Sequence, residues 1–157
     1  MQKTNAMRAL DRAHIDYTPH SYAGTGAVSG TEVAQALGFE PEKVFKTLVT
    51  EGKSGAHYVF IIPSNRELDL RKAAEAAKEK SVAMIRAKDL LPLTGYVHGG
   101  CSPIGMKKQF ITFLDESARQ RDTIVISAGK IGYQIELRPE DLMKSVPLAL
   151  VDVAEEV

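Results

Sequence analysis

The stretch Val44-Phe45-Lys46-Thr47-Leu48-Val49 places one cation inside what otherwise has the pattern of a buried β-strand. Side chains of an extended segment alternate between two faces, so Lys46 shares its face with Val44 and Leu48. The opposite face is also mainly apolar. Because an unpaired buried charge is costly, a lysine here either extends its amine to water at the sheet rim or meets a partner. The strand pattern alone favours the rim position.

A second apolar run, His57 to Ile62, follows after a polar connection and ends at Pro63. Two such runs joined by a short polar segment predict a β-hairpin over residues 44–62. Further strands are expected at 17–22, 82–85, 110–114, 123–127 and 133–137, with an edge strand at 149–153. A second hairpin is expected at residues 129–132, where two glycines flank the turn.

Helices are expected between these strands, and several carry recognisable start signals. Thr4 or Asn5 can cap a helix over residues 4–15, Asp69 can cap one to about Lys78, and Ser29 with Glu32 forms a capping box. That capping box opens a helix over residues 31–37, which Gly38 ends. A helical turn is expected at 89–91, ended by Pro92, and a last short helix at 140–145 after Pro139.

Short strands interleaved irregularly with helices predict an α+β fold with a mixed, partly antiparallel sheet. A doubly wound parallel sheet fits less well, because it requires regular alternation and a glycine fingerprint. With 157 residues, the chain suits a single domain spanning 1–157, large enough to bury a core without disulfides or metal.

The composition sets limits on the partners. Lys plus Arg and Asp plus Glu both number 20, so contact with a nucleic acid requires a local basic patch rather than a global field. The N-terminal residues lack the apolar core of a secretion signal, and no apolar run is long enough to cross a bilayer. We therefore expect a cytoplasmic protein that does not bind membranes. A single cysteine, Cys101, excludes an intramolecular disulfide.

Two glycine-rich stretches interrupt the regular pattern. Residues 23–30 contain GxG-like spacings, but they lack the third glycine and follow no buried parallel strand, so a mobile loop is favoured over a phosphate cradle. Residues 94–105 hold four glycines and one proline, which predicts a loop with special backbone angles.

The residue pattern gives little support for a metal site or for a cysteine or serine nucleophile. The four histidines and Cys101 form no metal-ligand pair of the usual spacing, so no metal site is expected. His98 with Cys101 suggests an activated thiol, but no orienting acid accompanies it, and a buried structural cysteine is favoured. No G-x-S-x-G elbow occurs. The basic pairs Lys107-Lys108 and Arg71-Lys72 are interpreted as solvated surface.

Five motifs, taken in order along nearly the whole chain, resemble the YbaK family of free-standing aminoacyl-tRNA editing proteins. They are His20-Ser21-Tyr22, Val44 to Leu48, Leu68 to Lys72, Gly95 to Gly105, and Ile135-Glu136-Leu137. This family is related to the editing domain of bacterial prolyl-tRNA synthetase. The resemblance implies a barrel-like sheet surrounded by short helices, no cofactor and no metal. It also implies an aminoacyl-tRNA 3′ end as substrate and prolyl-tRNA synthetase as a partner.

The resemblance further implies removal of cysteine from tRNA for proline, and in some members from the cysteine tRNA, by attack of the substrate's own thiolate to form a thiolactone. It maps Lys46, Gly99 and Tyr22 to the catalytic positions. The substrate-binding positions that it implies are Pro103, Ser127, Gln134, Gly100 and Ser102. Gln134 departs from the pattern, because some members carry aspartate there; an amide can orient a substrate but cannot accept its proton. Editing of alanine, or a non-catalytic binding module, remain alternatives.

Overall fold

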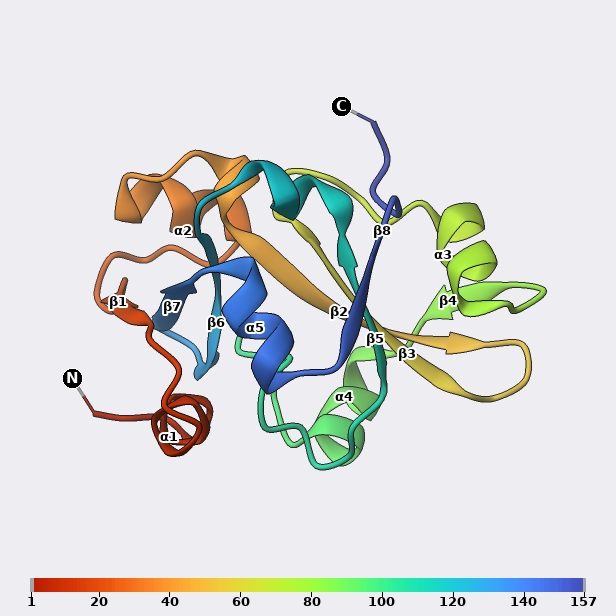
Figure 1. Cartoon of the computed structure of the whole chain (residues 1–157), viewed down its shortest axis with the longest axis horizontal. Coiled ribbons are helices and arrows are strands. Elements are labelled where there is room, and N and C mark those ends of the chain that lie inside the picture. The colour runs from red at the N-terminus through yellow and green to blue at the C-terminus, as the bar shows by residue number, and fades with distance from the viewer. Residues whose placement is uncertain (1, 157) are drawn as a thin grey trace.

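The computed structural model describes residues 2–156 and shows an α+β fold with two β-sheets (Figure 1). The five-stranded sheet has the spatial order β4 (Val82–Met84), β2 (Phe45–Gly52), β3 (His57–Pro63), β5 (Ile111–Asp115) and β8 (Leu148–Val151). The three-stranded sheet has the order β1 (Thr18–Ser21), β7 (Tyr133–Leu137) and β6 (Ile124–Lys130). The helices are α1 (Asn5–Arg12), α2 (Gly30–Leu37), α3 (Leu70–Ala77), α4 (Ala87–Thr94) and α5 (Pro139–Ser145), with 3-10 turns η1 (Pro41–Lys43) and η2 (Glu116–Gln120).

The predicted fold class is confirmed, and the mixed character lies in the larger sheet. Strands β2, β3 and β4 pair antiparallel, whereas β3 with β5 and β5 with β8 pair parallel. The smaller sheet is antiparallel throughout. Within residues 2–156 the sheets meet at a parallel bridge between Val44 and Val125 and do not close into a barrel.

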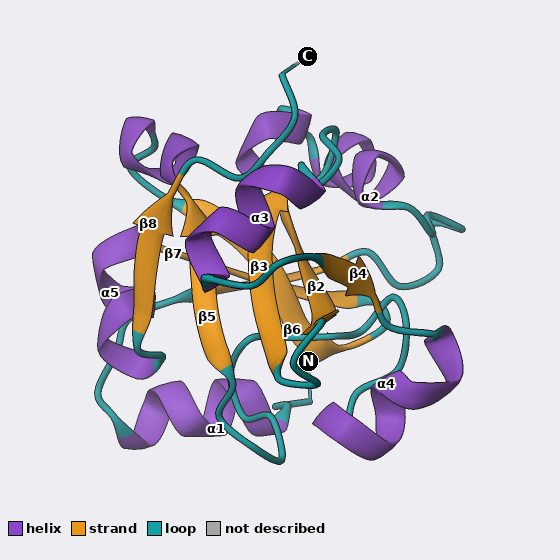
Figure 2. Ribbon diagram, turned by 90° about the vertical axis from the view of Figure 1, so that its right-hand side faces the viewer, coloured by secondary structure: helices purple, strands orange, loops and turns teal. Residues whose placement is uncertain are grey.

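The hairpin predicted around Lys46 is confirmed as β2 and β3, which pair from Phe45↔Pro63 to Glu51↔His57. Strand β3 is buried on both faces, as the central strand of the sheet requires. Helix α3 covers one face of this sheet (Figure 2). Phe60 and Ile62 pack in a cluster with Ala73 and Ala74 of α3, while Val59 and Ile61 join the larger core.

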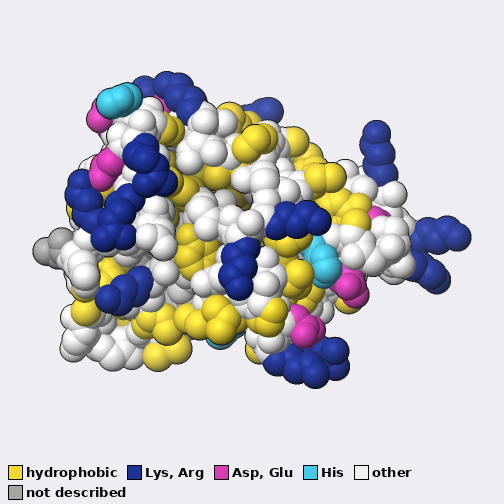
Figure 3. Space-filling view, turned by 90° about the horizontal axis from the view of Figure 1, so that it is seen from below, with side chains coloured by type: hydrophobic (Ala, Val, Ile, Leu, Met, Phe, Trp, Pro, Cys, Tyr) yellow, Lys and Arg dark blue, Asp and Glu magenta, His cyan; other side chains and the backbone are white. Residues whose placement is uncertain are grey.

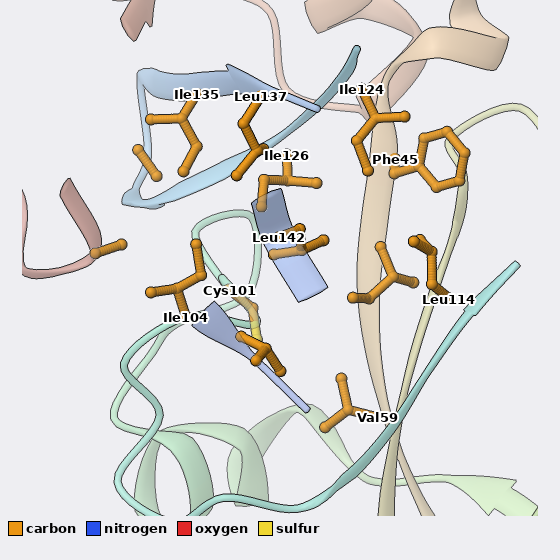
Figure 4. Packing of buried hydrophobic residues seen from close by; sticks show 14 of the residues in the cluster. Phe45, Val59, Cys101, Ile104, Leu114, Ile124, Ile126, Ile135, Leu137 and Leu142 are labelled. Atoms are coloured by element: carbon orange, nitrogen blue, oxygen red, sulfur yellow. The ribbon is translucent and has the colours of Figure 1, made fainter. Parts of the chain in front are cut away.

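The larger core fills the space between the two sheets. Ile124 and Ile126 of β6, and Ile135 and Leu137 of β7, point into it from the smaller sheet (Figure 4). Phe45 and Leu114 from the larger sheet face them, and Leu142 of α5 enters between. All are at most 2% exposed. Each buried side chain of this size contributes about 1.5–3 kcal/mol.

The helix starts follow the predicted caps. The Thr4 hydroxyl accepts a hydrogen bond from the Met7 amide, Asp69 caps α3 through the Lys72 amide, and Ser29 and Glu32 form both bonds of the capping box. Gly38 ends α2 at φ 77°, as expected.

Two helix ends differ from the sequence prediction. Helix α1 stops at Arg12 rather than 15, because His14 turns the chain back with φ 57°. Helix α4 continues past Pro92 to Thr94, so Pro92 does not end it. A proline there removes only one helical hydrogen bond, and the Thr94 hydroxyl donates to the Leu90 carbonyl at 2.8 Å.

The remaining differences at strand ends are small. Strand β7 has the predicted bounds, β8 is the predicted edge strand, and β6 runs on to Lys130, which leaves Ile131 and Gly132 in the turn. Among residues 2–156, none of the helices is both long and apolar enough to cross a bilayer.

Candidate active site

A pocket of about 370 Å³ opens where the two sheets meet. Its walls come from β2, the start of α2, the connection from β4 into α4, the loop around Gly99, and the smaller sheet. Five of the residues implied by the family resemblance line it: Tyr22, Lys46, Gly99, Ser127 and Gln134.

Strand pairing brings three of these residues together from distant parts of the chain. Ser127 of β6 lies opposite Gln134 of β7. Val44 forms an isolated parallel bridge with Val125, and Lys46 and Ser127 each lie two residues further along their strands. Lys46, Ser127 and Gln134 all line the pocket.

The Lys46 ammonium is neither deeply buried nor fully paired. Its side chain is 28% exposed, and its nitrogen lies 3.8 Å from a carboxylate oxygen of Glu67, whose side chain is 79% exposed. An ion pair that long to a solvated carboxylate is weak. The lysine at the pocket wall is therefore available to an anionic or polar ligand.

Two of the residues that line the pocket each carry a buried side-chain oxygen with no hydrogen-bond partner among the described residues. They are Thr47, with Oγ1, and Gln134, with Oε1, and Gln134 is 6% exposed. Leaving a buried acceptor unpaired costs about 1–3 kcal/mol, so an ordered water or a ligand that donates to these atoms would be favoured. An ammonium group or a hydroxyl has the required donors.

Acidic groups do not contribute to the wall of this pocket as residues 2–156 form it. Among these residues, no Asp or Glu lines it, and no group of three or more His, Cys, Asp or Glu side chains could hold a metal ion. The wall therefore offers no carboxylate as general base or metal ligand.

Cys101 lines the same pocket but also belongs to the hydrophobic core. The side chain is 9% exposed and packs among core residues (Figure 4). Burial raises the pKa of the Cys101 thiol to about 12, although the Thr94 hydroxyl acts in the opposite direction. At neutral pH this thiol stays protonated, which makes it a poor nucleophile.

The other implied residues, Gly100, Ser102 and Pro103, do not line the pocket. All three are buried behind Gly99. The Ser102 hydroxyl accepts from the Ile104 amide at 3.2 Å, and a Cβ on Gly100 would lie 3.1 Å from the Ile131 nitrogen. In this arrangement they shape the loop that presents Gly99.

Sequence reasoning missed Thr47 and Arg86 in the wall and did not place His98 there. Thr47 has the strand position that alternation assigns to the face opposite Lys46, yet this residue also lines the pocket. Arg86 reaches the pocket wall because β4 pairs with β2, and no local sequence pattern indicates that pairing. Its one signal is an arginine where a helix start usually carries Ser, Thr or Asp.

Beside the pocket, Glu136 ties the smaller sheet to the turn η1. Its carboxylate accepts from Thr123 Oγ1 at 2.6 Å, lies 2.9 Å from Lys43 Nζ and hydrogen-bonds His20 Nε2 at 2.8 Å. Burial acts to raise the pKa of Glu136, but these three partners outweigh it and lower the pKa to about 2.

This lowered pKa predicts acid sensitivity. A carboxylate with a depressed pKa stabilises the fold above its ordinary pKa, and that stability is lost as pH falls through the folded value. Between pH 4.5 and about 2 the protein should lose up to ~3 kcal/mol through Glu136. Urea unfolding of Glu136→Gln should show a flatter pH dependence over this range. Glu155→Gln, at an exposed position, serves as control, and an unchanged slope in Glu136→Gln would contradict the assignment.

Comparison with known proteins agrees with this architecture. A model of the aminoacyl-tRNA editing domain matches residues 26–145. EbsC of Enterococcus faecalis, assigned as a candidate Cys-tRNA(Pro)/Cys-tRNA(Cys) deacylase, is 50% identical over 143 residues, which are 90% of this chain and 87% of EbsC. Proline–tRNA ligase of Thermosipho melanesiensis is 28% identical over 102 residues, which are 65% of this chain but 18% of the ligase.

Among solved structures, a candidate trans-editing enzyme for prolyl-tRNA synthetase superimposes with a TM-score of 0.85 at 23% identity. The match covers 99% of this chain and 100% of that one, and it supports the fold. Taken with the domain match over residues 26–145, these findings show that the chain belongs to the family of aminoacyl-tRNA editing domains, which is a family of deacylases.

Proposed function

We propose that this protein is a trans-editing deacylase that removes cysteine from tRNA for proline, with Cys-tRNA(Cys) as a second substrate. Its identity to EbsC supports this choice of substrate. The chemical need is clear, because a synthetase pocket shaped for proline cannot strongly reject a side chain of similar size. A second site must then discriminate, and we place its action in the cytoplasm, where tRNA is charged.

The proposed mechanism uses the nucleophile of the substrate. The cysteine thiol gives its proton to solvent, and the thiolate attacks the ester carbonyl carbon. A carbon–sulfur bond forms, the ester carbon–oxygen bond breaks, and the 3′ hydroxyl of the tRNA takes up a proton. The products are a thiolactone and free tRNA. No protein nucleophile and no general base are required.

One observation carries this mechanism: the pocket wall holds Lys46 but, among the described residues, no carboxylate, and its cysteine is buried. In the proposal, Lys46 contacts the ester or the terminal phosphate as a point charge, which also stabilises the charge that develops on the carbonyl oxygen. Gly99 contacts the α-amino group through its backbone, and Tyr22 closes the wall. Ser127 and the unpaired Gln134 oxygen orient the aminoacyl group.

The deciding experiment compares three charged forms of one tRNA. Purified protein should deacylate Cys-tRNA(Pro) and spare Ser-tRNA(Pro), whose hydroxyl matches the size of the thiol but not its nucleophilicity. Release of alanine instead of cysteine would assign the chain to the alternative substrate class. No deacylation, even with prolyl-tRNA synthetase added, would leave a non-catalytic binding module.

Replacing Cys101 by alanine should leave deacylation within about twofold of wild type, because a thiol with a pKa of about 12 is not the nucleophile. The buried sulfur does contribute packing, so a melting temperature lower by a few degrees is expected. Single-turnover deacylation of Cys-tRNA(Pro) measures the effect. Loss of most of the activity with the fold intact would restore Cys101 as a protein nucleophile.

A further inference from the structure

Arg86 lies at the pocket rim, one strand away from Lys46. Strand β4 pairs with β2 through Thr50↔Met84, and the Ile85 amide donates to the Val49 carbonyl at 3.3 Å. Continuing that register places Arg86 beside Leu48. Leu48 is two residues from Lys46 along β2, a separation of about 6.6 Å.

Arg86 also forms the N-cap of α4, where a cation is unfavourable. Its side chain makes no cap hydrogen bond of the kind that Ser29 makes to the Glu32 amide of α2, and the corresponding Asp89 amide donates to the Arg86 carbonyl at 2.9 Å instead. A positive charge at a helix N-terminus opposes the helix dipole. The guanidinium lies 3.4 Å from Asp89 Oδ2 and is 75% exposed, so this ion pair does not explain its presence.

The pocket has positive character although the whole chain has no net charge. Lys and Arg side chains are spread over the face that carries α1 and α4, among hydrophobic ones, without forming one continuous strip (Figure 3). In the pocket, by contrast, Lys46 and Arg86 both line the wall, whereas no Asp or Glu of residues 2–156 does, and their ion-pair partners Glu67 and Asp89 lie outside it. Such a site selects an anion locally.

The exposed fractions of the two side chains indicate that Lys46 lies deeper in the pocket than Arg86. The Lys46 side chain is 28% exposed, whereas the Arg86 side chain is 75% exposed. Between them the rim offers apolar surface from Val28 and Met84, which are 80% and 46% exposed. A pocket of about 370 Å³ is in the range that holds a drug-sized molecule, so it has room for more than one aminoacyl group.

We propose that Arg86 and the uncapped N-terminus of α4 form a second anion-binding subsite, which holds a backbone phosphate of the tRNA 3′ end outward of the group that Lys46 contacts. This inference rests on the proposed function for the identity of the ligand. The aminoacyl end enters the pocket, the terminal nucleoside lies against Val28 and Met84, and the backbone leaves past Arg86. Lys46 and Arg86 then position successive parts of one strand.

Two stable probes test the subsite without catalysis. The first is adenosine carrying cysteine through a 3′ amide and no phosphate, and the second is the same group at the end of the trinucleotide CpCpA. Arg86→Gln should bind the trinucleotide about tenfold more weakly, the size of one charge-assisted hydrogen bond, and bind the nucleoside as wild type does. The slope of log affinity against log salt should fall by about 0.7 for the trinucleotide.

Lys88→Gln is the matched control, because it removes the same charge from the same helix at an exposed position that does not line the pocket. It should bind both probes as wild type does. Arg86→Gln should fold normally, since removing a cation from a helix N-terminus does not weaken the helix. Equal binding of both probes by Arg86→Gln and wild type, or equal weakening of both by Arg86→Gln, would overturn the subsite.

The outcomes also separate this inference from the proposed function. Deacylation of Cys-tRNA(Pro) without any effect of Arg86→Gln on the trinucleotide would leave the function standing and remove the subsite. Selective weakening of the trinucleotide in a protein that deacylates nothing would keep the subsite and remove the enzyme. Failure of wild type to bind either probe would overturn both.

Discussion

Replacing Lys46 by alanine should lower single-turnover deacylation of Cys-tRNA(Pro) by about 100-fold or more, the usual cost of removing one electrostatic contact to a developing charge. Lys46 lines the pocket together with Ser127 and Gln134, and its only ion pair within residues 2–156 is the long one to Glu67. Little stability depends on it, so the variant should melt within a few degrees of wild type. Folded but inactive protein is the expected result.

Two variants give this experiment its controls. Lys53→Ala removes a lysine from the exposed turn of the β2–β3 hairpin, outside the pocket, and should leave the rate unchanged. Lys46→Arg keeps the charge but replaces a compact ammonium with a planar fork, so partial activity is expected. If Lys46→Ala kept more than about a tenth of the wild-type rate, the lysine would not be the electrostatic contact proposed here.

Substituting alanine for Gly129 should destabilise the fold by about 2–5 kcal/mol, through backbone strain and overpacking. Gly129 has φ 91°, and a Cβ there would lie 2.8 Å from Cε1 of Tyr96. Tyr96 is 9% exposed, and its hydroxyl donates to the Ile104 carbonyl. The ring cannot move away without disturbing the loop that presents Gly99.

Gly55→Ala separates the two causes, because Gly55 has φ 93° but no atom of residues 2–156 within 4 Å of the place that a Cβ would take. It carries the backbone strain without the contact, and it should cost less than Gly129→Ala. Urea unfolding measures both variants, and deacylation adds a second readout, since only Gly129→Ala should also disturb the pocket. Equal losses of stability in the two variants would show that the contact with Tyr96 contributes nothing.

Local chemistry predicted much of this fold. Caps at Thr4, Ser29 and Asp69 depend on neighbours within a few residues, and the hairpin around Lys46 depends on a short connection, so each could be predicted from the sequence. The arrangement of the strands in two sheets could not be predicted in this way. The sheets meet at the bridge between Val44 and Val125, which joins segments far apart in the chain and leaves no local pattern in the sequence.

The candidate site, too, could be predicted only where local sequence decides it. The residue pattern marked Lys46 and the glycine loop as unusual, but it favoured the sheet rim for the lysine, and the family resemblance supplied its place in a site. Sequence alone could not show that Gly99 borders the pocket while Gly100 and Pro103 lie behind it, since that depends on how the loop packs against Ile131. Arg86 could not be predicted as a pocket residue for the same reason, because the pairing of β4 with β2 brings it to the pocket wall.

The pocket wall that residues 2–156 form without carboxylates has a consequence for fidelity. A hydrolase that activates water threatens every ester that fits its site, including the correctly charged one, and must rely on size to spare it. In the proposed mechanism the thiol of the substrate is the nucleophile, and proline carries no thiol, so Pro-tRNA would survive even if it entered. The filter would then act on reactivity rather than on shape, and a site roomy enough for a nucleotide could still make few mistakes.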